Sequence, residues 1–185
     1  HITSIAISPD GNMLAVSWLD YASGDTWDGG IQTVDLNTGK QTTLEANHVS
    51  TIRFISNSEF LTIECENVPF GNSGIDDKKR YREVIYQLEK GKVWENTTHY
   101  LRTQYEDSLY ADAAVYEDFQ FDSEKKADVI FVNLGTHLMI IDRNTYNILC
   151  EEDFSYPIVK MAVYDESTVL LGLADGSVER FWMDN

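Results

Sequence analysis

The chain has 185 residues, 43% hydrophobic and 24% charged, an ordinary composition for a folded domain with a core. It carries 31 acidic against 14 basic residues, a formal net charge of −17, and a field of this sign repels the phosphates of a nucleic acid. We therefore expect no nucleic-acid partner, and no apolar run approaches the roughly 18 residues of a membrane span.

The first 45 residues contain four short strand-like runs. Runs at 2–8 and 13–18 flank a Pro9-Asp10-Gly11 turn, which predicts a hairpin. After an insertion, an alternating run at 31–36 leads through Asn37-Thr38-Gly39-Lys40 into a fourth run at 41–44. We name the four predicted strands a, b, c and d in chain order.

The same pattern returns along the rest of the chain. In order from a, the further strands are expected at 51–55, 60–65, 84–88 and 92–95, then at 113–121, 129–134, 137–141 and 146–151, and finally at 158–164, 168–173 and 178–183. Strand c starts near Ile31, Val84, His137 and Val178, which gives spacings of 53, 53 and 41 residues. A repeat of roughly 40 to 50 residues with four strands predicts the blade of a β-propeller.

We therefore predict an all-β fold of about four four-stranded antiparallel blades, the last lacking its outer strand. The blades fall at about 2–45, 50–95, 112–151 and 157–184 of a single partial propeller domain spanning 1–185. Four blades are the lower limit for a propeller. Three arrangements stay open: part of a larger ring with further blades from the same chain, half of a ring completed by a second copy, or a small or open propeller. Uncovered blade faces and edges tend to be covered by another chain.

Three segments resemble WD-repeat propellers. Residues 5–15 resemble the first hairpin of that family, residues 30–40 its strand c with the following turn, and residues 171–182 its b–c hairpin. No Gly-His pair precedes a blade, and the terminal Trp-Asp is replaced by Val34-Asp35 and by Trp182-Met183-Asp184. The resemblance implies a divergent, bacterial-type WD-like propeller built for binding, in which the family's His–Ser–Asp–Trp network is largely absent.

The long connections predict where a partner binds. The b–c and d–a connections of antiparallel blades emerge at one end, and the long insertions at 19–29, 67–82 and 96–112 are all of these two kinds. Aromatic anchors ringed by charge are typical of a recognition surface. The candidate partner-binding residues are Tyr21, Asp25, Trp27, Asp28, Phe70, Asp76, Asp77, Arg80, Tyr81, Tyr100 and Tyr105. The same aromatics could instead only hold their own loops against the blades.

No catalytic constellation emerges from the sequence. The histidines His1, His48, His99 and His137 are scattered and the two cysteines lie apart, so we predict no catalytic residue, no metal ligand and no cofactor. Asp20, Asp25 and Asp28 match no calcium-loop spacing and are interpreted as solvated turn residues. We predict a non-catalytic interaction module for a protein or peptide partner. The alternative is a propeller enzyme, or a small-molecule or metal sensor, that uses the mouth of the central channel.

Overall fold

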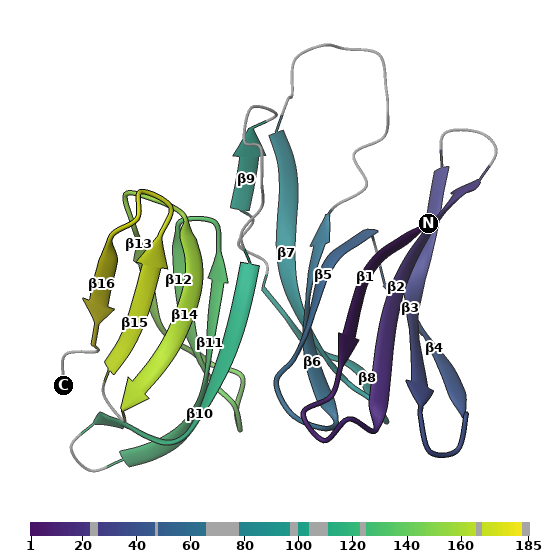
Figure 1. Ribbon diagram of the computed structural model, residues 1–185, viewed down its shortest axis with the longest axis horizontal. Coiled ribbons are helices and arrows are strands. Elements are labelled where there is room, and N and C mark those ends of the chain that lie inside the picture. The colour runs from purple at the N-terminus through teal and green to yellow at the C-terminus, as the bar shows by residue number, and fades with distance from the viewer. Residues whose placement is uncertain are drawn as a thin grey trace. The chain divides into compact units, whose positions relative to one another are not determined.

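The computed structural model describes residues 1–22, 26–46, 48–65, 78–96, 100–103, 111–122, 125–165 and 168–182. Within these ranges the strands form four antiparallel sheets joined in chain order (Figure 1). No helix of the described ranges is long and apolar enough to cross a membrane. The chain divides into two compact units, His1–Asp107 and Ser108–Asn185, and each unit holds two of the sheets.

The first sheet has the order β1-β2-β3-β4. Its strands are β1 (Ile2–Ile7), β2 (Met13–Ala22), β3 (Thr26–Asp35) and β4 (Gln41–Glu45). Local turn chemistry sets its hairpins: the Asp35 carboxylate accepts the backbone N–H groups of Asn37 and Thr38, both at 2.9 Å. Gly39 follows at a φ of 70°, a conformation that favours glycine.

The second sheet runs β5-β6-β7-β8, with a fifth strand, β9, paired to β7. Its strands are β5 (His48–Phe54), β6 (Glu59–Cys65), β7 (Lys78–Gln87), β8 (Gly91–Glu95) and β9 (Tyr100–Thr103). Ile31 of the first sheet packs in one buried cluster with Ile52, Phe60 and Val84 of the second. The backbone N–H of Ile52 also donates to Ser4 Oγ at 3.1 Å. The two sheets therefore share a core and a direct hydrogen bond.

The second unit repeats this arrangement with two sheets of its own. The strands are β10 (Ala111–Asp122), β11 (Lys125–Leu134), β12 (His137–Asp142), β13 (Ile148–Asp153), β14 (Ile158–Asp165), β15 (Thr168–Leu173) and β16 (Val178–Phe181). Phe131 and Ile140 of one sheet are buried against Met161 and Leu171 of the other. The inner strands are buried on both faces, because the consecutive residues Val129–Val132 of β11 and Leu138–Ile141 of β12 are all buried and successive strand residues point to opposite faces.

The all-β fold with its blade-like sheets is confirmed, including a last sheet of three described strands. The expected insertions differ from the structure. Residues 19–22 and 26–29 continue the ladder of β2 and β3, residues 78–82 belong to β7, and β9 lies inside the expected 96–112 connection. The glycines and aspartates of these segments predict loops, but the Tyr, Trp and Thr residues between them favour strands, and the structure has strands there.

Candidate functional site

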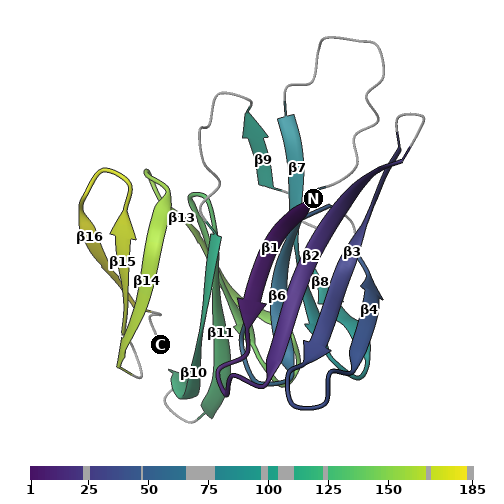
Figure 2. The same cartoon turned by 45° about the vertical axis from the view of Figure 1, so that its right-hand side comes forward.

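Two antiparallel extensions project from the first unit at the end where its b–c and d–a connections lie (Figure 2). The first, here called the extended hairpin, pairs Leu19–Ala22 of β2 with Thr26–Gly29 of β3. The second, here called the side ladder, pairs Lys78–Tyr81 of β7 with Tyr100–Thr103 of β9. Both extensions are held by backbone pairing.

The extensions carry six of the eleven predicted partner-binding residues. In the extended hairpin, Tyr21 is the register partner of Trp27, and Asp28 is the register partner of Asp20. In the side ladder, Tyr81 is the register partner of Tyr100, and Arg80 that of Leu101. The structure therefore places four predicted aromatic residues in two cross-strand pairs. The other five predicted residues, Asp25, Phe70, Asp76, Asp77 and Tyr105, lie outside the described residues.

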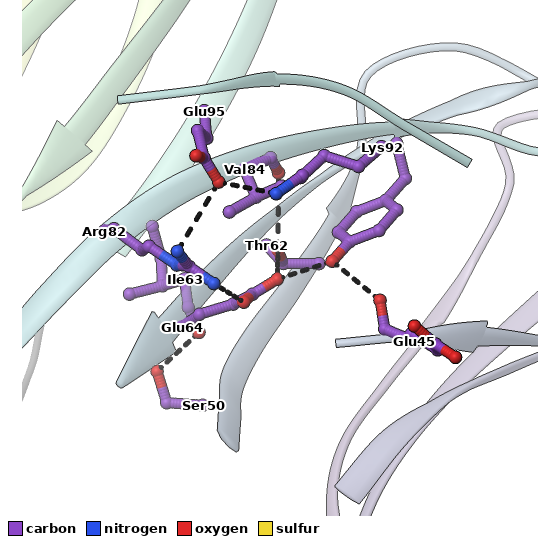
Figure 3. A network of polar contacts seen from close by, with 10 residues as sticks. Glu45, Ser50, Thr62, Ile63, Glu64, Arg82, Val84, Lys92 and Glu95 are labelled. Carbon is purple, nitrogen blue, oxygen red and sulfur yellow. Dashed lines mark hydrogen bonds and ion pairs between the residues drawn. The ribbon is translucent and has the colours of Figure 1, made fainter. Parts of the chain in front are cut away.

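A buried ion pair lies at the base of the side ladder, where β7 leaves β6 (Figure 3). Glu64 and Arg82 are register partners, and Arg82 Nη2 donates to Glu64 Oε2 at 3.1 Å. The Glu64 side chain is only 1% exposed. A carboxylate at such a depth requires both a countercharge and hydrogen-bond donors, since its desolvation is otherwise costly.

Those donors come from its own strand β6 and from the neighbouring strand β7. Glu64 Oε1 accepts hydrogen bonds from the Tyr86 hydroxyl at 2.7 Å and from Thr62 Oγ1 at 3.2 Å. The Tyr86 hydroxyl also lies 3.3 Å from the backbone carbonyl of Glu45, at the end of β4 in the first sheet. Burial, and then the negative charge of Glu64, raise the pKa of Tyr86 far above its usual value. Tyr86 therefore stays protonated and links the two sheets.

Arg82 also connects outward to β8. Its Nη1 lies 3.4 Å from Glu95 Oε2, and Lys92 Nζ lies 2.8 Å from the same oxygen. A cleft of about 450 Å³ opens beside this network. It is lined by Leu44, Glu45, Ala46, Glu64, Arg82, Tyr86, Gly91 and Lys92. The volume suits a small ligand. The Glu64 carboxylate in the wall of this cleft already accepts hydrogen bonds from Arg82, Tyr86 and Thr62. We therefore interpret the network as a structural one that holds β6, β7 and β8 together.

The sequence alone did not single out this network. One signal was present: Glu64 stands inside the apolar run Phe60–Cys65, and a carboxylate in a buried strand needs a partner. The partner Arg82 lies across a long insertion, so its register with Glu64 is visible only in the folded sheet.

The second unit places a histidine between two carboxylates. His137 Nδ1 lies 3.0 Å from Asp153 Oδ1, and its Nε2 lies 3.4 Å from Glu151 Oε1. No group of three His, Cys, Asp or Glu side chains within the described ranges is arranged to hold a metal ion. Each ring nitrogen of His137 instead lies beside one carboxylate.

Neither a protein-family model nor a curated protein matches the sequence. Solved structures do match. The computationally designed protein Ika8 aligns with 98% of this chain and 45% of its own at 13% identity and a TM-score of 0.58. The computationally designed protein Ika4 aligns with 100% of this chain and 92% of its own at 14% identity and a TM-score of 0.52.

A natural propeller also matches. The β-propeller domain of the Trilobed protease from Pyrococcus furiosus, described as having an open velcro topology, aligns with 100% of this chain at 8% identity and a TM-score of 0.51. The chain spans 59% of that protein's chain. At these identities the likeness concerns the fold alone, and at that level the predicted resemblance to propeller blades is confirmed.

Proposed function

We propose that this chain is a non-catalytic β-propeller module that binds a protein or peptide partner through the extended hairpin and the side ladder of its first unit. The observation that supports this proposal most is that both elaborated connections leave the same end of the unit as paired strands. Residues on paired strands are held more rigidly than residues on irregular loops, which lowers the entropy lost on binding.

The composition of the two extensions supports the same proposal. They combine Tyr21, Trp27, Tyr81 and Tyr100 with charged residues, and aromatic side chains together with arginine dominate the binding energy of protein interfaces. The buried Glu64–Arg82 pair secures the base of the side ladder to its sheet. The remaining predicted residues, Asp25, Phe70, Asp76, Asp77 and Tyr105, belong in sequence to the connections between these strands, and we assign them to the same surface.

Truncating the paired aromatics tests this function. The immobilised chain is used to capture partners from a source-cell lysate, and each captured partner is then titrated against the variants Y21S/W27S and Y81S/Y100S. Loss of an anchor residue at an interface costs about 2 kcal/mol or more, so we expect at least about thirtyfold weaker binding.

The matched control is Leu36→Ser. Leu36 is 49% exposed in the c–d turn, at the opposite end of the first sheet from the extended hairpin. All variants are first checked for an unchanged thermal transition. Retention of every partner by both aromatic double variants, together with loss of binding in Leu36→Ser, would show that the partner surface lies at the other end.

A further inference from the structure

The side ladder is basic, although the protein as a whole is acidic. Its four register pairs contain the basic residues Lys78, Lys79, Arg80 and Arg102 and no acidic residue, whereas the whole chain has a net charge of −17. These four basic residues outnumber Asp76 and Asp77, which directly precede Lys78 in the sequence, so the ladder contributes a local excess of positive charge at the end that we assign to partner binding.

The register brings two of these charges together. Lys79 is paired with Arg102, and like charges directly opposite each other destabilise an antiparallel pair. Since a two-stranded ladder is only marginally stable on its own in water, an anionic neighbour would stabilise this one.

The side ladder also has strand edges that no described strand occupies. The pairing of β6 with β7 ends at Cys65 and Tyr81, and within the described ranges Lys78–Arg80 pairs with β9 alone. β9 in turn pairs with β7 alone among the described strands. A strand edge without a neighbouring strand presents backbone N–H and C=O groups to an extended peptide, which can join as a further strand.

We propose that the side ladder takes up an extended acidic segment of a partner protein as an added strand. This proposal rests on the proposed function and names the chemistry of its partner. Backbone pairing supplies the affinity, and the basic residues select carboxylate side chains on the incoming strand.

The length scale of the charges favours a short acidic peptide over a nucleic acid. Four strand residues span roughly 13 Å, while the Debye length at physiological salt is about 8 Å. A peptide lying along the ladder is therefore influenced mainly by charges within that distance, because charges farther away are screened. A nucleic acid also lacks the backbone N–H and C=O groups that an added strand requires.

The experiment measures fluorescence anisotropy of a labelled peptide, acetyl-(Glu-Val)₄-amide, titrated with the full chain. Three comparison probes are used: acetyl-(Lys-Val)₄-amide, the Glu-Val peptide with alternate backbone nitrogens methylated, and a single-stranded oligothymidylate of eight nucleotides. We expect saturable binding of the Glu-Val peptide, with at least about tenfold weaker binding of the other three.

The matched variants are K79E/R102E in the side ladder and K40E/K90E in two exposed c–d turns. Both double variants have the same net charge. We expect K79E/R102E to weaken Glu-Val binding at least about tenfold and K40E/K90E to change it less than about twofold.

The proposal is overturned if the Glu-Val peptide does not bind, if the methylated peptide or the oligothymidylate binds as tightly, or if both double variants lose binding equally. Its failure is distinguishable from failure of the proposed function. Weaker partner binding by Y21S/W27S or Y81S/Y100S upholds the surface even if the acidic peptide fails.

Discussion

Removing Arg82 alone from the buried Glu64–Arg82 pair should destabilise the protein more than removing both members. The perturbation is a double-mutant cycle with Arg82→Met, Glu64→Leu and the combined variant, since these changes replace each ion by an apolar side chain of similar volume. Arg82→Met leaves the Glu64 carboxylate, 1% exposed, without its guanidinium partner at 3.1 Å. Breaking a buried ion pair in this way costs about 3–5 kcal/mol.

The reverse single change is milder. Glu64→Leu leaves Arg82 with a side chain that is 20% exposed and still 3.4 Å from Glu95, so we expect a loss of about 1–3 kcal/mol. In the double variant no buried charge is left without its partner. We expect it to be more stable than Arg82→Met by at least about 1 kcal/mol, with a coupling energy of about 2 kcal/mol or more.

The assay is native-state hydrogen exchange of the β6 amides against urea, because it reports on the first unit separately from the second. The control is Lys92→Met, which breaks a pair whose lysine side chain is 48% exposed and should cost no more than about 1 kcal/mol. If the double variant loses as much unfolding free energy as the two single variants together, Glu64 and Arg82 are not coupled and the reasoning is refuted.

Three further predictions concern Tyr86 and the glycines of strands and turns. Tyr86→Phe removes the hydroxyl that donates to Glu64 at 2.7 Å and should cost about 1.5–3 kcal/mol at pH 7 in urea unfolding. Because burial and Glu64 raise the pKa of Tyr86 in the folded chain, the wild type loses stability as pH rises above about 10, where the unfolded tyrosine ionises. The Phe variant lacks that loss, so the difference in unfolding free energy between it and the wild type should become smaller between pH 9 and pH 11. A difference that stays constant over this range would contradict the raised pKa of Tyr86. Gly30→Ala places a Cβ 3.2 Å from the Leu44 carbonyl oxygen and should destabilise by about 1–3 kcal/mol, whereas Gly172→Ala, whose nearest atom is 3.8 Å away, should be neutral or gain up to about 1 kcal/mol in thermal unfolding. Gly39→Ala has open space around its Cβ but a φ of 70°, so a loss of about 1–2 kcal/mol should come from the backbone alone, and no change would show that the turn relaxes.

The hairpins of the fold could be predicted from sequence because their turns are determined locally. The Pro9-Asp10-Gly11 turn and the Asp35–Gly39 turn contain their own hydrogen-bonding groups, and the alternating apolar runs around them identify strands. The repeat of these hairpins then indicated blades.

The β9 strand and the ion pair were not predicted, since both depend on non-local register. Nothing within Tyr100–Thr103 indicates that it pairs with Lys78–Tyr81 rather than continuing a loop. Likewise, Glu64 and Arg82 become partners only once β6 and β7 are aligned across residues 66–81. Single-sequence patterns fix which residues alternate, and they leave open which distant strands meet.

The most direct test of the account is a hydrogen-exchange footprint of the full chain with and without a captured partner. We predict new protection at Leu19–Ala22, Thr26–Gly29, Lys78–Tyr81 and Tyr100–Thr103, with unchanged exchange in the c–d turns at 37–40 and 89–91. Protection confined to those c–d turns, with the extended hairpin and the side ladder unaffected, would contradict it.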